Sequence, residues 1–126
     1  MTQPSYLSRR LHSFGYALRG LAILAATQHN ARIHAIATVL VIAAGVLFRI
    51  SLTEWCLIVL AITCVWVAEA LNTAIEFLVD LVSPDPQPLA AKAKDVAAGA
   101  VLIAAIGALA IGIIVLGPKI WDSVLG

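Results

Sequence analysis

The residues best suited to chemistry lie inside a strongly hydrophobic part of the chain, which Glu69, Asn72, Glu76 and Asp80 interrupt. On an α-helix, offsets of three, seven and eleven residues return near one azimuth, so these four polar groups line one stripe. A charged side chain at the centre of a membrane helix costs about 2.5–3.5 kcal/mol on insertion scales. Several on one face therefore need partners, water or a metal ion. Hydrogen-bonded association of helices is the structural alternative, but asparagine alone would serve that purpose.

Carboxylates, a lysine and arginines are together the parts of a phosphoryl-transfer site. Mg²⁺ takes oxygen ligands, commonly one or two protein carboxylates with phosphates and water, and Glu76 is placed for this role. Lys94, at the start of a helix, is placed to hold phosphate oxygens. Glu69 lies two helical turns deeper than Glu76, about 10 Å by helix rise, where it can take a proton from a lipid hydroxyl. No P-loop is present, since Gly107 and Gly112 have only its first spacing and lie in an apolar run.

Composition places the chain among integral membrane proteins. Its 126 residues are 62% hydrophobic and 12% charged, too apolar for a soluble domain and too short for more than three or four spans. We therefore expect one all-α membrane domain over residues 1–126. Lysines and arginines flank apolar runs without forming one basic patch, which argues against a nucleic-acid partner. The cysteines and histidines show no zinc spacing, and no removable signal peptide is expected.

Four segments must position the polar stripe. Apolar residues at alternating steps of four and three predict an amphipathic helix over residues 5–26, which lies on the membrane surface or packs on neighbouring helices. Apolar runs predict three transmembrane helices, at about residues 33–48, 55–79 and 96–116. Three prolines predict an exposed loop over residues 83–88.

Basic residues beside the spans predict the orientation. Six of them lie on the side of the N-terminus and the proline loop, which places that side in the cytoplasm: Arg9, Arg10, Arg19, Arg32, Lys92 and Lys94. Two lie on the other side: Arg49 and Lys119. The Glu76 end of the stripe therefore faces the compartment that holds ATP. Small residues in the third span form a ladder that lets helices approach closely: Ala100, Ala104, Ala108 and Gly112.

The motif Glu69-Ala-Leu-Asn72-Thr-Ala-Ile-Glu76-Phe-Leu-Val-Asp80, with Ala93-Lys94-Asp95 downstream, resembles the prokaryotic diacylglycerol kinase and undecaprenol kinase family. The resemblance begins at Gly15-Tyr16 and extends through all three spans. It implies a homotrimeric enzyme of the cell (inner) membrane, with a surface helix and three transmembrane helices per subunit and with sites shared between subunits. It also implies that MgATP phosphorylates a lipid alcohol, either diacylglycerol or undecaprenol.

The resemblance also implies roles for individual residues. Glu69 is similar to the catalytic base, and Glu76 with Gln28 to the residues that hold Mg²⁺ and contact ATP. The other positions similar to ATP-binding residues are Arg9, Tyr16, Asp85, Gln87, Lys94 and Asp95. Those expected to bind the acceptor lipid are Arg9, Arg32, Glu69 and Asn72. Gln28 departs from the family, which commonly has a glutamate there; its amide oxygen can coordinate a metal ion but adds no charge.

Two questions stay open at this stage. The alternative class is a non-enzymatic membrane protein whose intramembrane carboxylates carry ions or protons. The cluster of Lys94, Asp95 and arginines at one membrane surface suits a nucleotide better than a path through the membrane. For the acceptor, Asn30-Ala-Arg32-Ile-His34 is more similar to the undecaprenol kinase branch, so we expect undecaprenol to be the better substrate, with diacylglycerol also accepted.

Overall fold

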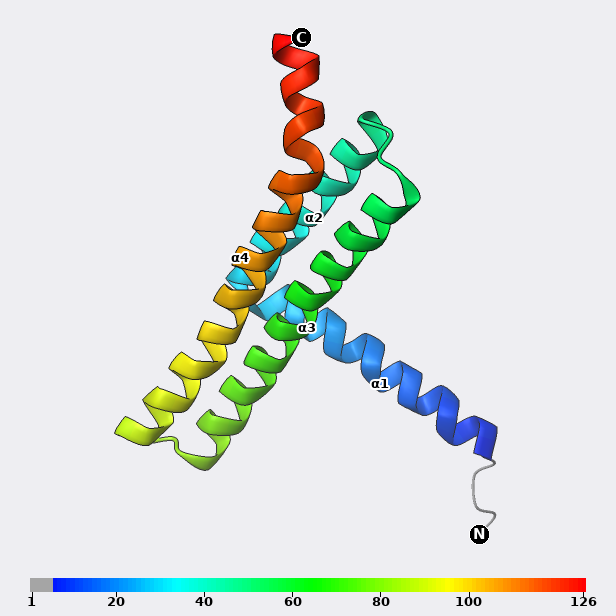
Figure 1. Cartoon of the computed structure of the whole chain (residues 1–126). Coiled ribbons are helices and arrows are strands. Elements are labelled where there is room, and N and C mark those ends of the chain that lie inside the picture. The colour runs from blue at the N-terminus through cyan, green and yellow to red at the C-terminus, as the bar shows by residue number, and fades with distance from the viewer. Residues whose placement is uncertain (1–5) are drawn as a thin grey trace.

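The computed structural model describes residues 6–126 as four α-helices (Figure 1): α1 (Tyr6–Thr27), α2 (His29–Leu47), α3 (Leu52–Val82) and α4 (Pro88–Leu125). The predicted all-α class is confirmed, and α2, α3 and α4 are each long and apolar enough to cross a membrane. By helix rise α2 is about 28 Å long, close to the thickness of a bilayer's hydrocarbon core. The longer α3 and α4 extend beyond that core. Residue 5, where the predicted surface helix begins, lies outside the described residues.

Local sequence signals set the starts of α3 and α4. A capping box begins α3, because the Glu54 amide donates to the Ser51 hydroxyl at 3.3 Å and the Ser51 amide donates to the Glu54 carboxylate at 2.6 Å. α3 therefore begins three residues before the span predicted at residue 55. Pro88 lies in the first turn of α4, where a missing amide hydrogen costs nothing. The connection between α3 and α4 is accordingly residues 83–87, one residue shorter than the predicted proline loop.

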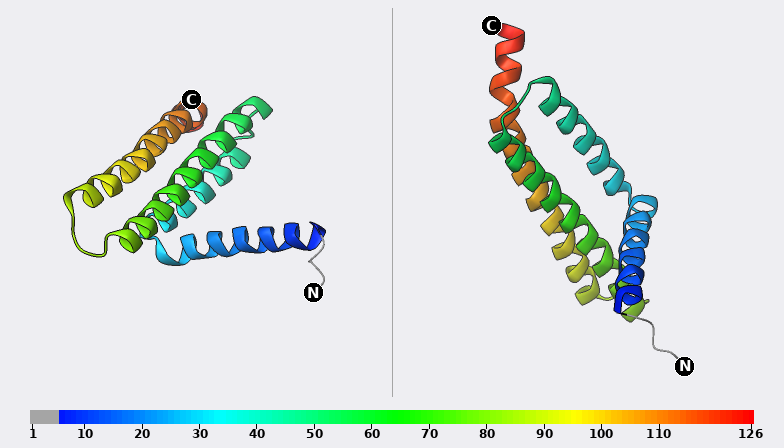
Figure 2. Two further views of the ribbon diagram at one scale, coloured as in Figure 1. Left: turned by 90° about the horizontal axis from the view of Figure 1, so that it is seen from below. Right: turned by 90° about the vertical axis from the view of Figure 1, so that its right-hand side faces the viewer.

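The three long helices form a slender bundle from which α1 projects. α3 and α4 run side by side, and α2 packs mainly on α3 (Figures 1 and 2). In Figure 1 and in the left view of Figure 2, α1 runs at an angle to the other helices and away from them. Most large apolar side chains of the bundle are exposed in the single chain. Lipid or further protein must cover them, since so much apolar surface is not left in water.

The turn between α2 and α3 depends on close packing around one glycine. Gly45 is buried, and a Cβ atom there would lie 2.8 Å from the Trp55 ring and 3.1 Å from Ile50. Ile50 belongs to the small core at this end of the bundle, together with Ile58, Val115 and Leu116. α2 and α3 can therefore meet this closely because Gly45 has no side chain. An ion pair of 3.2 Å between Lys119 and Glu54 joins α4 to the same end.

Candidate active site

The polar residues of α3 become progressively more exposed toward the end of that helix. The Glu69 side chain is completely buried, Asn72 is buried and Glu76 is half-buried. Asp80, near the C-terminal end of α3, has a side chain that is 64% exposed. One helix thus carries carboxylates from the interior of the bundle to its surface.

A cluster around Glu76 joins α3 to the junction between α1 and α2. Asn72 Nδ2 donates to Glu76 Oε1 at 3.0 Å, and Gln28 Nε2 donates to Glu76 Oε2 at 3.5 Å. Gln28 is the N-cap residue of α2, but its side chain makes no capping hydrogen bond and reaches toward Glu76 instead. The structure therefore brings together two residues predicted to hold the metal ion, although 48 positions separate them in the sequence.

The donor set of this cluster fits Mg²⁺. Glu76 supplies one carboxylate, and the buried Asn72 Oδ1 has no hydrogen-bond partner among the described residues. Gln28 can present its amide oxygen after rotation of the amide group. Mg²⁺ usually takes one or two carboxylates and completes its shell with water and substrate phosphates, so no protein-only cage is required. Within residues 6–126, no three His, Cys, Asp or Glu side chains converge to form such a cage.

Glu69 faces α2, where His34 approaches it. His34 Nε2 lies 3.6 Å from Glu69 Oε2, and neither carboxylate oxygen of Glu69 accepts a hydrogen bond from the described residues. One further bond joins this region of α2 to α3, because Trp66 Nε1 donates to Thr38 Oγ1 at 3.1 Å. Within α2, Thr38 Oγ1 in turn donates to the His34 carbonyl at 2.7 Å. The site prediction did not include His34, Thr38 or Trp66, because a pair between two helices leaves no spacing signal in the sequence.

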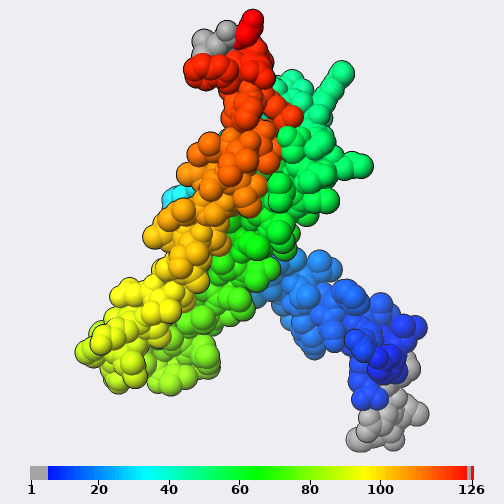
Figure 3. Space-filling model, viewed as in Figure 1, coloured from blue at the N-terminus to red at the C-terminus, as the bar shows by residue number. Residues whose placement is uncertain are grey.

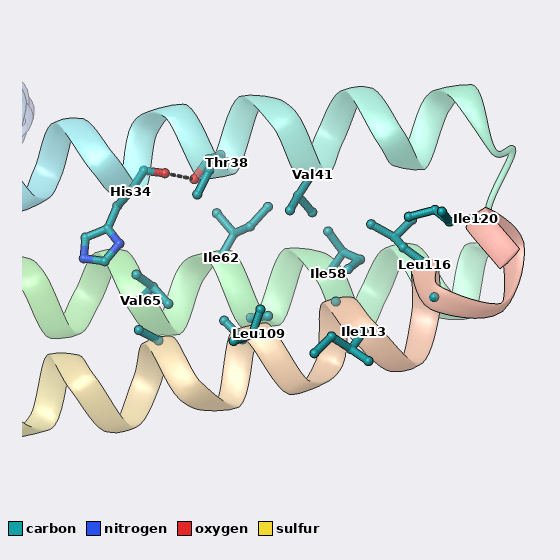
Figure 4. A pocket seen from close by; sticks show the side chains of 16 residues that line it. His34, Thr38, Val41, Ile58, Ile62, Val65, Leu109, Ile113, Leu116 and Ile120 are labelled. Atoms are coloured by element: carbon teal, nitrogen blue, oxygen red, sulfur yellow. Dashed lines mark hydrogen bonds between the residues drawn. The ribbon is translucent and has the colours of Figure 1, made fainter. Parts of the chain in front are cut away.

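An apolar cavity begins beside this pair and runs along the bundle. It has a volume of about 420 Å³ and lies between α2, α3 and α4. Figure 4 shows His34 at one end, apolar side chains such as Ile62 and Leu109 along it, and Ile120 toward the other end. Ala108 and Gly112 of the small-residue ladder also line it. Part of that ladder therefore faces α2 and α3 of the same chain.

Lys94 lies near the exposed end of α3. Its ammonium group pairs with Asp80 at 2.5 Å, across the loop that joins α3 and α4. Asp95 is exposed beside it, and Asp85 and Gln87 lie exposed in the loop itself. The four predicted ATP-binding residues of the loop and of α4 thus lie at the end of the bundle where α3 joins α4.

The predicted residues of α1 do not join this site within the chain. Arg9 and Tyr16 are exposed, and their side chains make no hydrogen bond or ion pair with the polar residues of α3 in the part of the chain described. Figure 3 shows α1 as an arm that stands away from the bundle. Arg32 is exposed as well, with its guanidinium 3.5 Å from the Ala26 carbonyl at the junction of α1 and α2.

Three helices able to span a membrane, with carboxylates graded from a fully buried glutamate to a surface cluster, are the features expected of a small membrane-embedded enzyme. Residues 15–116 match the family described as prokaryotic diacylglycerol kinase, and the chain belongs to that family. The predicted resemblance is therefore confirmed.

Two named relatives support the same enzyme class. The undecaprenol kinase of Bacillus subtilis is 42% identical over 114 residues, which cover 90% of this chain and 93% of the relative. The diacylglycerol kinase of a Synechocystis species is 45% identical over 103 residues, which cover 81% of this chain and 59% of the relative. The predicted class of lipid kinase is confirmed, and the alternative of a non-enzymatic ion or proton carrier is not favoured.

Proposed function

We propose that this protein transfers the γ-phosphoryl group of ATP to the hydroxyl of a membrane lipid alcohol, with Glu69 as the general base. The observation that carries the proposal is the completely buried Glu69 carboxylate, which accepts no hydrogen bond from the described residues. Burying a carboxylate without compensation is costly, so such a group is retained where its basicity is used. A structural carboxylate would be expected to have donors around it.

In this mechanism the bundle separates proton transfer from phosphate binding. Glu69 receives the hydroxyl proton as the acceptor oxygen attacks the γ-phosphorus, and the bond to the leaving ADP breaks. Asn72 orients the Glu76 carboxylate, and Glu76 with Gln28 would hold Mg²⁺. When bound, the ion neutralises charge on the phosphates. Lys94 supplies a mobile positive charge for the same phosphates, since its present partner Asp80 is exposed and only weakly bound to it.

For the acceptor, we infer a preference for undecaprenol over diacylglycerol. The relative matched over nearly its whole length is named an undecaprenol kinase, which supports this choice. The cavity beside His34 is apolar along its length and suits part of the hydrocarbon tail of either alcohol, so the preference rests on the relative. Comparing kcat/KM for the two alcohols in one bilayer system tests the choice, and a strong preference for diacylglycerol would reverse it.

We further propose a homotrimer in the inner membrane, with the N-terminus and the ATP site in the cytoplasm. The uncovered apolar faces of the bundle support assembly. The distribution of basic residues supports the orientation. Arg9 and Tyr16 would then contact ATP at a neighbouring subunit's site, because α1 holds them away from their own.

The test is ATP-dependent phosphorylation of lipid by the purified protein. We expect Glu69→Gln to insert and assemble normally but to lose about 10²–10⁴-fold in kcat, because the amide keeps the shape and removes the base. Glu54→Gln is the matched control. Glutamine can still close the capping box, and the partly exposed ion pair with Lys119 contributes little. Turnover by Glu69→Gln at the wild-type rate would contradict the assignment.

A further inference from the structure

The buried carboxylate of Glu69 has one basic side chain close to it among the described residues. Among residues 6–126, His34 is the one basic side chain with a nitrogen within 4 Å of the Glu69 carboxylate, with 3.6 Å between Nε2 and Oε2, and no described residue donates a hydrogen bond to that carboxylate. That distance is longer than a hydrogen bond. Contacts between catalytic groups are often long in the free enzyme and tighten in the substrate complex.

We propose that His34 positions Glu69 and accepts the proton that Glu69 removes from the acceptor hydroxyl. The proposal rests on the lipid-kinase function given above. In the transfer step, the hydroxyl O–H bond breaks, a Glu69 O–H bond forms, the acceptor oxygen bonds to phosphorus and ADP leaves. Glu69 is then a neutral acid and must lose its proton before another turnover.

Burial makes that second step difficult without a partner. The Glu69 side chain has no exposed surface, so it cannot give its proton directly to water. His34 is 16% exposed and lies on the first turns of α2, five residues from the exposed His29. By helix rise His34 lies about 7.5 Å along α2 from His29, at about the depth of Glu69, and its side chain keeps the exposed surface that Glu69 lacks. His34 Nε2 can take the proton from Glu69 and release it toward water.

Among the described residues, the cavity beside His34 contributes no other charged side chain. The α4 residues beside it in the cavity are Ala105, Ala108 and Leu109, none of which carries charge. On α3 the charged group facing it is Glu69, and on its own helix His29 and Arg32 are exposed. Of the described residues that line the cavity, His34 is the only titratable one.

The experiment compares His34→Gln and His34→Ala with the wild-type protein in bilayers, using ATP and whichever of the two lipid alcohols the wild type phosphorylates. Glutamine keeps a hydrogen-bond donor for Glu69 but cannot accept its proton. We expect both variants to lose roughly 10²-fold in kcat, the low end for acid–base groups, with little change in KM for ATP or lipid. Added imidazole should restore turnover of His34→Ala, because the space left beside the cavity can admit it.

Leu109→Ala is the matched control for chemical rescue. It enlarges the same cavity from α4 without removing a base. Imidazole should therefore not change the turnover of Leu109→Ala, even where the substitution itself has lowered that turnover. If His34→Gln keeps kcat within about twofold of wild type, the role of His34 is wrong and the kinase function stands. Loss of activity in His34→Ala that imidazole does not restore would also overturn it. Absence of turnover in the wild type would overturn the proposed function itself.

Discussion

Changing Gln28 to glutamate tests whether Glu76 and Gln28 hold the metal ion together. The Gln28 amide nitrogen lies 3.5 Å from a Glu76 oxygen, so a carboxylate in its place would face a second negative charge. With the charge centres about 4.5 Å apart and an effective dielectric constant of 20–80, the repulsion is about 1–4 kcal/mol in the metal-free protein. Bound Mg²⁺ removes this repulsion, so the substitution should strengthen Mg²⁺ binding by at least that amount.

The lower figure of 1 kcal/mol corresponds to about fivefold in affinity. We therefore expect Gln28→Glu to lower the Mg²⁺ concentration for half-maximal activity at least about fivefold. A second measurement avoids ATP: without nucleotide, the variant should unfold at a lower temperature than wild type when metal is absent and show a larger rise in Tm on adding Mg²⁺.

Asn30→Asp is the control for added charge alone, because Asn30 is exposed on the first turn of α2 and makes no hydrogen bond with Glu76 in the described chain. It should leave both measurements near wild type. If Gln28→Glu behaves like Asn30→Asp in both, the ion is held elsewhere and the cluster around Glu76 is structural.

Three further predictions concern packing, ATP and assembly. Gly45→Ala should destabilise the protein by about 1–3 kcal/mol, measured as a lower Tm in detergent, because its Cβ atom would overlap the rigid Trp55 ring. Lys94→Ala should raise the KM for ATP about 10–100-fold with a smaller change in kcat, since a charge-assisted hydrogen bond to phosphate contributes about 1.5–3 kcal/mol. Mixed assemblies of Arg9→Ala and Glu69→Gln subunits should regain activity that neither shows alone, up to about a quarter of wild type for random trimers with shared sites.

Matched variants sharpen these predictions. Gly107→Ala should not destabilise the protein, because nothing lies within 4 Å of a Cβ atom there. Asp80→Asn breaks the exposed pair with Lys94 and should change the KM for ATP less than Lys94→Ala does. An equal KM effect in both variants would mean that the pair, and not the lysine, is what matters. Mixed assemblies without activity would mean that each site is built from one chain.

Sequence reasoning succeeded where the relevant residues share one helix. Glu69, Asn72 and Glu76 belong to a single long apolar segment, and helical periodicity alone places them on one face. The same holds for the all-α class, because runs of this length and apolarity form helices in a membrane. The family could also be identified, since the motif on α3 is contiguous.

Contacts between helices could not be read in this way. The pair of His34 with Glu69 joins α2 to α3, and the hydrogen bond from Trp66 to Thr38 does the same. Such pairs depend on the rotation of each helix about its axis, which packing determines and periodicity does not. The start of α3 is different: Ser51-Leu-Thr-Glu54 is a capping-box pattern that could have moved the predicted boundary to residue 52.

The length of α3 supports the two tasks proposed for its carboxylates. Its capped start and the interfacial Trp55 place the beginning of the helix at one membrane surface. A hydrocarbon core about 30 Å thick takes up about 20 residues, so it ends near residues 72–75 on the other side. Glu69 then lies about 5–9 Å inside the boundary, within the hydrocarbon region. Glu76 lies at the boundary and Asp80 beyond it, in agreement with their rising exposure. In the proposed mechanism a single helix therefore presents a base to the lipid and phosphate-binding groups to the water. Removing one turn between Glu69 and Glu76 would bring the two carboxylates about 5 Å closer along the helix axis and should abolish turnover.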